Sequence, residues 1–352
     1  MWRLRFARRP PNRLPEATTN PACEVVALFS GGLDSLCGAA HLAQRGKQTL
    51  LLTHSPPGFD RVRQMIAALN PSNPGAFQYG SISIAPEQHD RDGRRTRFQE
   101  FTRRTRPFLY LSLASAAAIV TGAREVQMSE NGALGASLPF RRSHHGPRVT
   151  RQGHSLMMEG FERLLSNIRP GATPIRFVNP FRSTTKGEAC AELALDPRAA
   201  HLTLSCEYTG QQVARLRGYF AKDAAVAWGP TTARQCGLCV PCIVRRSALR
   251  RAGIRDGQSD YFFDAAAVLR RKPARGSNVN ESTPLFGFAS VHPFYAHRFA
   301  TEMLSMDLSA FSAKFFNELS YLRPRIRSRS DLAEVLDLQR RFAHELLEFL
   351  NG

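Results

Sequence analysis

The sequence has no apolar run long enough to cross a lipid bilayer. Its most apolar stretch, residues 107–120, is shorter than the roughly 20 residues that a spanning helix needs, and it contains two serines. Residues 1–22 are rich in arginine and proline and lack the apolar core of a secretory signal. We therefore expect no membrane partner and a basic flexible arm over residues 1–22, with an arginine-rich organellar presequence as the alternative.

Lysine is scarce, and nearly all of the positive charge comes from arginine. The chain of 352 residues has 48 basic and 29 acidic residues, a formal net charge of +19, with lysine only at positions 47, 186, 222, 272 and 314. Such a charge favours association with nucleic acid or with an acidic protein and does not predict a fold. A GC-rich genome would explain the arginine excess equally well. We favour an acidic protein partner, and nucleic acid stays open.

The first third of the chain alternates between strand-like and helix-like patterns. Buried-strand patterns cover residues 24–29, 48–53, 78–84 and 125–129, and helical patterns cover residues 35–45, 60–69 and 107–121. This alternation predicts an α/β fold with a parallel sheet. Residues 131–173 show little periodicity and predict a long loop. Thr185 and Glu188 then predict a capping box ahead of a helix over residues 189–195.

Composition divides the chain into four predicted parts. The last part contains three phenylalanines at helical spacing, Phe311, Phe315 and Phe316, and an amphipathic pattern over residues 331–350. The parts are a basic arm over 1–22, an α/β domain over 23–200, a cysteine-bearing segment over 201–255 and a mainly helical C-terminal extension over 256–352.

A glycine-containing turn follows the first predicted strand and opens the first predicted helix. It reads Ser30-Gly31-Gly32-Leu33-Asp34-Ser35. Two glycines let the backbone approach a ligand closely, and the free amides of the helix favour an anion such as phosphate. Asp34 fits a phosphate-bound Mg²⁺. Because the Walker A and dinucleotide-binding glycine patterns are missing, the turn predicts a different phosphate site, with an ordinary strand-to-helix turn as the alternative.

Three of the seven cysteines are crowded into one short turn. Cys236, Cys239 and Cys242 have the spacing of metal ligands in a reducing compartment, which favours the cytoplasm. A fourth ligand is needed, for which Cys206 is the best candidate and His201 the runner-up. Four thiolates predict a structural Zn²⁺ site. An iron–sulfur cluster and a group of buried free thiols are the alternatives.

The turn at residues 30–35 resembles the Ser-Gly-Gly-x-Asp-Ser motif of the PP-loop ATP pyrophosphatases. That resemblance implies a sheet of the adenine-nucleotide α-hydrolase (HUP-like) type and a loop that holds the β- and γ-phosphates of ATP during adenylation of a substrate. With the cysteine pattern, the chain resembles the 7-cyano-7-deazaguanine synthase (QueC) family over residues 24–250. Segments 203–206, 236–245 and 180–188 are similar to that family's motifs, and residues 106–109 match roughly.

The chain also departs from the family pattern. The segment after the second strand differs, 29 residues separate Cys206 from Cys236, and the two terminal parts have no counterpart. Such enlarged members occur in bacterial antiviral defence operons (the QatC-like group), and this chain resembles that group more closely. The resemblance implies a ligase that adenylates 7-carboxy-7-deazaguanine and transfers it to an amine, with a partner protein as the expected acceptor. A nitrile-forming synthase using ammonia, a tRNA-modifying PP-loop enzyme and a non-enzymatic scaffold are the alternatives.

These patterns and the resemblance together give a set of candidate site residues. For Lys186, Arg106 and the 130–132 segment, a plain surface residue or turn is the alternative, and we expect His144, His145 and His154 to be surface residues. The catalytic candidates are Asp34, Lys186 and Arg106; the nucleotide-binding candidates are Ser30, Gly31, Gly32, Leu33, Asp34, Ser35 and Thr53; the substrate-binding candidates are Glu130, Asn131 and Gly132; and the metal ligands are Cys206, Cys236, Cys239 and Cys242.

Overall fold

The computed structural model describes most of the chain in nine stretches. These are residues 23–54, 59–69, 75–82, 106–140, 153–207, 234–257, 260–270, 292–322 and 325–352. The predicted basic arm lies outside the described residues, as do His144 and His145. In the part of the chain that is described, no helix has both the length and the apolar character to cross a membrane.

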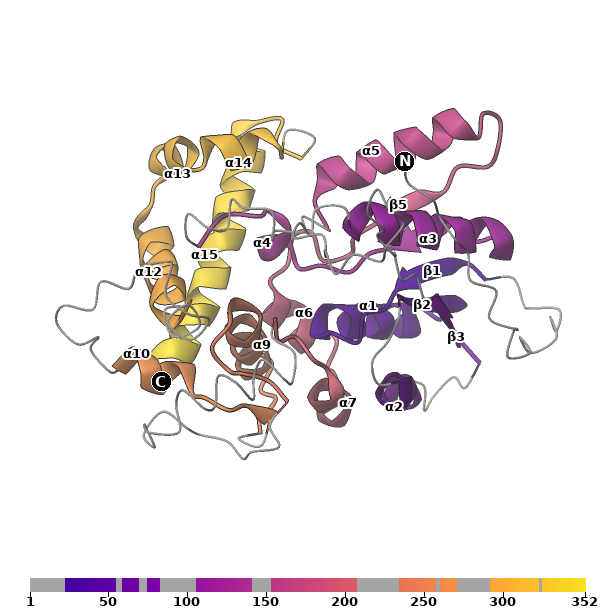
Figure 1. Cartoon of the computed structure of the whole chain (residues 1–352). Helices are drawn as coiled ribbons and strands as arrows, with labels where there is room; N and C mark the ends of the chain where they lie inside the picture. The colour runs from indigo at the N-terminus through magenta and orange to yellow at the C-terminus, as the bar shows by residue number, and fades with distance from the viewer. Residues whose placement is uncertain are drawn as a thin grey trace, which may run out of the picture.

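Five strands form one all-parallel sheet in the order β3-β2-β1-β4-β5, which confirms the predicted α/β fold (Figure 1). In the register, Val25 lies opposite both Thr49 and Glu125. The three-residue β5 was not predicted, because so short a segment carries no clear alternation. The strands are β1 (Val25–Leu28), β2 (Thr49–His54), β3 (Phe77–Ile82), β4 (Glu125–Gln127) and β5 (Arg176–Val178).

Helices cover both faces of this sheet (Figure 1). Because successive side chains of a strand point to opposite faces, Val25 packs with α1 (Leu33–Gln44) and α2 (Phe59–Leu69). Val26 packs on the other face with α3 (Arg106–Thr121) and α5 (Ser155–Ile168). Both faces of the sheet are therefore buried, as the continuous apolar runs of its strands indicate.

The predicted loop over residues 131–173 is wrong in part, because it contains α4 (Gly132–Gly135) and α5. Met158 and Phe161 bury one face of α5. His154, predicted to be a surface residue, is buried, and its Nδ1 accepts a hydrogen bond from the Leu156 amide at the start of α5. Histidine is not among the usual N-cap residues, so the start of this helix carries no usual N-cap signal.

The rest of the described chain is mainly helical. The predicted capping box between Thr185 and Glu188 is confirmed, and its helix begins at Lys186, three residues earlier than predicted. The helices are α6 (Lys186–Glu192), α7 (Pro197–Leu202), α9 (Val240–Arg251), α10 (Ala265–Arg270), α12 (His292–Ser305), α13 (Leu308–Lys314), α14 (Phe316–Ser320) and α15 (Arg329–Asn351).

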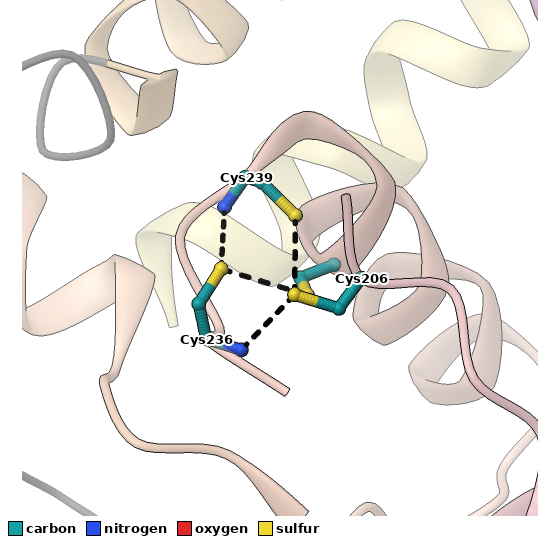
Figure 2. A group of neighbouring side chains, drawn as sticks. Cys206, Cys236 and Cys239 are labelled. Atoms are coloured by element: carbon teal, nitrogen blue, oxygen red, sulfur yellow. Dashed lines mark hydrogen bonds between the residues drawn. The ribbon is translucent and has the colours of Figure 1, made fainter. Parts of the chain in front are cut away.

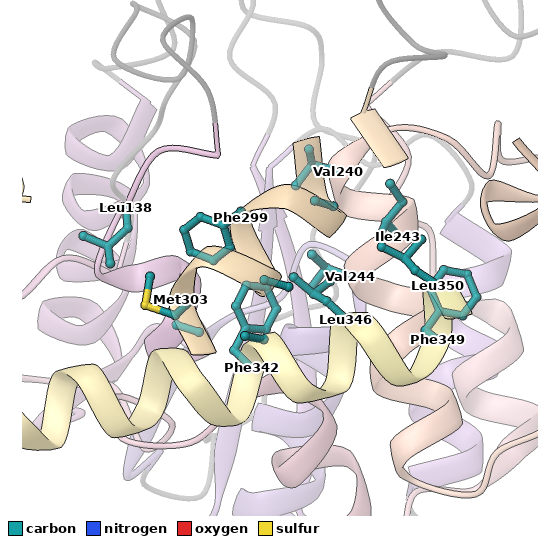
Figure 3. Close-up of a cluster of buried hydrophobic side chains, with 14 of the residues drawn as sticks. Leu138, Val240, Ile243, Val244, Phe299, Met303, Phe342, Leu346, Phe349 and Leu350 are labelled. Carbon is teal, nitrogen blue, oxygen red and sulfur yellow. The ribbon is translucent and has the colours of Figure 1, made fainter. Parts of the chain in front are cut away.

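A second apolar core joins the C-terminal helices to the cysteine-bearing turn. Cys236 and Cys239, which precede α9 (Figure 2), and Cys242, in its first turn, belong to this core. On α15, Phe342 and Leu346 point toward α12 and α9 (Figure 3). The C-terminal helices and the cysteine turn therefore bury their apolar side chains against each other.

We expect Phe342→Ala to lower the free energy of unfolding by about 3–5 kcal/mol, because it leaves a cavity in this core. Phe342 is 1% exposed. Urea unfolding followed by circular dichroism measures the change, and Glu348→Ala, at an exposed position of the same helix, is the control. A loss below about 1 kcal/mol for Phe342→Ala would show that α15 is not part of the cooperative core.

Candidate functional site

The turn at residues 30–35 lies at the carboxyl edge of the sheet, between β1 and α1. Gly31 has a φ of +74°, a conformation that favours glycine. The N-terminus of α1 has no side-chain cap, so its first amides are free to bind an anion. The Ser35 hydroxyl donates to the Gly32 carbonyl over 2.8 Å, and the Ser30 hydroxyl accepts from the Gly32 amide over 3.3 Å. Both serines therefore hold the turn as well as offering hydroxyls.

Asp34 is the point where three predicted site residues meet. Its carboxylate is 2.9 Å from the Nζ of Lys186, and its other oxygen accepts a hydrogen bond from the Asn131 side chain over 3.3 Å. Asn131 also caps α4 through the Leu134 amide. These residues come from α1, α6 and the loop after β4, so the parallel sheet brings together segments that are far apart in the sequence.

Lys186 is buried, with 5% of its surface exposed. Burial disfavours the charged amine, but the attraction of the Asp34 carboxylate outweighs this cost and raises the pKa of Lys186. Asp34 is 24% exposed at its side chain. The lysine is therefore a fixed positive charge, while the aspartate keeps access to a ligand.

Glu130 and Gly132 flank Asn131 in the loop after β4. Burial raises the pKa of Glu130 to about 7, and the Gly153 amide, which donates to its carboxylate, opposes that shift. Asn179, after β5, accepts from the Glu130 amide over 3.3 Å and donates to its carbonyl over 2.8 Å. Gly132 is buried, and its amide donates to the Thr184 carbonyl. This loop is thus held firmly beside Asp34.

Two other predicted residues do not join this group. Thr53 is buried at the end of β2, and its hydroxyl donates to the Phe29 carbonyl over 2.6 Å, which ties β2 to β1. Arg106 begins α3 and is exposed. The ring contact between Tyr110 and His54 places this end of α3 near the end of β2, but no described residue forms an ion pair with Arg106.

A cavity of about 290 Å³ adjoins the loop after β4. Asn179 was not among the predicted site residues, because the three-residue strand that it follows has no clear sequence pattern. The walls combine the α/β domain with the C-terminal helices, and include Gly132, Gly153, Asn179, Arg182, Arg325 and Glu334. The cavity is large enough for a small organic ligand.

The sulfurs of Cys206, Cys236, Cys239 and Cys242 form a compact group beside the start of α9, as predicted. Figure 2 shows three of these residues, Cys206, Cys236 and Cys239. All four lie within 4.8 Å of one another. The sulfurs of Cys236 and Cys242 are 3.9 Å apart, and those of Cys206 and Cys239 are 4.0 Å apart. A tetrahedron of thiolates around one Zn²⁺ has sulfur–sulfur edges of about 3.8 Å, because each Zn–S bond is about 2.3 Å.

The surroundings of the sulfurs also fit a metal. Burial raises the pKa of Cys239 and Cys242, so these thiols need a bound cation to ionise. Backbone amides point at the sulfurs, as from Cys239 to Cys236 over 3.3 Å. Sulfurs within 4.8 Å of one another are spaced to hold a single ion. His201, the runner-up ligand, instead faces Asp260 over 3.3 Å.

The cysteine group is connected to the turn at residues 30–35 through the backbone before Cys206. The Leu204 amide donates to the Gly31 carbonyl over 3.1 Å. Next to it, the Ser205 amide donates to the Gln235 side chain over 3.0 Å, and Gln235 precedes Cys236. A metal held by these cysteines would therefore also fix the segment that supports the turn.

We expect the purified chain to contain one Zn²⁺, and Cys239→Ala to lose it and to lower the Tm by about 10 °C or more, because metal binding contributes to folding. Elemental analysis and thermal unfolding measure both effects. Cys23→Ala is the control, because Cys23 is also a buried cysteine but lies in the core that α3 and α5 form with the sheet. Full zinc content in Cys239→Ala would contradict the site.

We expect the stability of the chain to fall as pH rises through about 7, partly because of Glu130. Its pKa is raised in the folded protein, so its contribution is complete below its ordinary pKa and is lost as the folded carboxyl ionises. Between pH 5 and 8, the wild type should lose about 1–3 kcal/mol more than Glu130→Gln. Urea unfolding at both pH values measures this, and equal losses would contradict the buried-carboxyl interpretation.

Comparison of the chain with protein-family models and with curated proteins finds no match in either set. The functional assignment therefore depends on the residues and geometry of the site. The described site has a glycine turn at a helix N-terminus, a buried lysine paired with an accessible aspartate, and a cavity nearby. A helix N-terminus and a nearby cation favour an anion, and the cavity has room for a small organic molecule.

Proposed function

We propose that the chain is an ATP-dependent ligase of the PP-loop type, similar to the QueC family. In this proposal, it adenylates the carboxylate of 7-carboxy-7-deazaguanine or a related deazapurine and transfers the acyl group to an amine, forming a C–N bond. One observation carries the proposal: the Ser30–Ser35 turn follows a central parallel strand, and its Asp34 is paired with the buried Lys186. The motif is thus accompanied by a cation suited to phosphate.

The nucleotide would lie over the N-terminus of α1. The free amides of this helix and the hydroxyls of Ser30 and Ser35 would bind the phosphates of ATP. Asp34, which is partly exposed, would hold the Mg²⁺ that accompanies ATP and neutralises part of its charge. Lys186 would stabilise the negative charge that builds up as pyrophosphate leaves.

The substrate would lie toward the loop after β4. The adjoining cavity offers room there, and Asn179 and Arg182 in its walls offer polar groups. A carboxylate oxygen of the substrate attacks the α-phosphorus of ATP, and pyrophosphate leaves. An amine nitrogen then attacks the activated carbonyl carbon, AMP leaves, and the nitrogen loses a proton. The chain's part is to hold both reactants in line.

The acceptor proposed here is an amine of an acidic partner protein in a bacterial antiviral defence system. The net charge of +19 supports attraction to an acidic macromolecule. All seven cysteines are free in the structure, which agrees with a reducing cytoplasm. With ammonia as the acceptor, the first product would be the amide, and a second ATP-dependent step would dehydrate it to the nitrile. A tRNA acceptor is the other alternative.

The direct test incubates the zinc-loaded chain with ATP, Mg²⁺, 7-carboxy-7-deazaguanine and either ammonia or a co-expressed partner protein. We expect substrate-dependent formation of AMP and pyrophosphate, and a mass increase on the partner. Lys186→Ala should lower kcat by about 100-fold or more, because it removes a charge that acts in the transition state.

Lys47→Ala is the matched control, since Lys47 pairs with Glu24 on the surface, and it should retain full activity. Mass spectrometry of the partner and chromatography of the nucleotides provide the measurements. Absence of turnover with every acceptor, or equal activity of Lys186→Ala and the wild type, would refute the proposal.

A further inference from the structure

The C-terminal helix α15 contacts the segment that carries Lys186. Thr185, the residue before this lysine, is fully buried and caps α6. From α15, Glu345 accepts a hydrogen bond from the Thr185 hydroxyl, and Glu345 is itself only 5% exposed. A carboxylate 160 positions further along the chain therefore touches the immediate neighbour of the lysine.

Glu345 also lies against the residue after the lysine. A Cβ atom on Gly187 would be 2.6 Å from the Oε1 of Glu345, so the missing side chain lets the carboxylate approach the backbone of α6. Burial raises the pKa of Glu345 to about 7, while hydrogen bonds from Thr185 and the Gly187 backbone oppose the shift. These two bonds hold a carboxylate whose burial is otherwise costly.

Arg341, one helical turn before Glu345, holds the same segment from a second direction. Its guanidinium pairs with Glu188 over 2.5 Å and donates to the Ser183 carbonyl over 3.2 Å. Residues four positions apart lie on the same face of a helix, so Arg341 and Glu345 face α6 together. Helix α15 thus contacts the chain both before and after Lys186.

Lys186 needs the support of α15, because two effects disfavour a cation at this position. It is a cation at the first position of α6, where the positive end of the helix dipole disfavours it, and its burial adds a further cost. Asp34 offsets these costs best at the observed separation of 2.9 Å, and its attraction weakens as the two groups move apart. A displacement of the 185–187 backbone would therefore weaken the pair.

We propose that Glu345 is a positioning residue, which holds Lys186 against Asp34 through Thr185 and Gly187. The C-terminal extension then sets the geometry of the phosphate-binding edge, in addition to forming a core of its own. The catalytic consequence rests on the proposed function. The placement of Lys186 is independent of the proposed function, and it can be measured on the full chain without any substrate.

The scarcity of lysine makes this measurement direct. The purified full chain is treated with a trace of N-hydroxysuccinimidyl acetate, and mass spectrometry gives the acetylation rate of each lysine. Lys47 and Lys314, whose side chains are 40% and 44% exposed, serve as internal references. In Glu345→Gln, we expect Lys186 to be acetylated at least about threefold faster relative to these references, because its backbone support opens locally.

Two further variants separate positioning from general loosening. Glu348→Gln changes an exposed glutamate of the same helix and should match the wild type, as should Thr185→Ser, which keeps the hydroxyl that Glu345 accepts from. An unchanged rate at Lys186 in Glu345→Gln would overturn the proposal. An equal rise at Lys47, Lys186 and Lys314 would also overturn it, because it would indicate general destabilisation.

The kinetics of the proposed reaction provide an independent test. If the proposed function holds, Glu345→Gln should lower kcat by about 10-fold, with a smaller change in the KM for ATP, because a displaced Lys186 chiefly affects the transition state. An unchanged kcat would overturn the role of Glu345 in the reaction. If the wild type shows no turnover while Lys186 acetylation still rises in Glu345→Gln, the proposed function fails and the positioning role stands.

Discussion

The buried ion pair between Lys186 and Asp34 is the interaction on which the carboxyl edge of the sheet depends. Taking two charges out of water is costly, and their attraction repays that cost only in good geometry. Four parts of the chain provide this geometry: α1 carries Asp34, α6 carries Lys186, Asn131 donates to Asp34 and α15 contacts the residues around Lys186. The pair is therefore a product of tertiary structure.

Helix α9 connects this edge to the rest of the molecule. Val240 and Ile243, in its first turn, lie in the core shared with the C-terminal helices. Ala248 and Leu249, near its end, lie in the core that α1 and α2 form on one face of the sheet. Between them, the fully buried Arg245 donates to the Thr203 hydroxyl over 3.2 Å and to the Ala200 carbonyl over 3.0 Å. One helix thus fixes the two cores relative to each other.

Much of the fold could be predicted from local patterns. Four of the strands, the strand–helix alternation of the parallel sheet, the capping box at Thr185 and the turn with three cysteines depend on short-range signals. Cys206 joins that turn across 29 intervening residues of the sequence. Helix α5 was not predicted although its pattern is amphipathic, because its N-cap is a histidine, which is not a usual start signal.

The candidate site was only partly predictable. Asp34, Lys186 and Asn131 stand at element ends, where the carboxyl edge of a parallel sheet gives them a recognisable place. Glu345 lies on a long amphipathic helix far along the chain, and its contact with Thr185 depends on how that helix packs. A sequence pattern fixes which face of α15 is apolar and does not say which element that face meets.

The hydrogen bond from the Cys236 amide to the sulfur of Cys206, 3.4 Å long, brings together the two ends of the 29 residues between these cysteines. With both ends held at one point, the free energy of closing the intervening loop depends only weakly on its length. A change in the number of residues between Cys206 and Cys236 is therefore expected to cost little stability. The backbone contact at the cysteine group makes the closure of the fold there nearly independent of how long the connecting chain is.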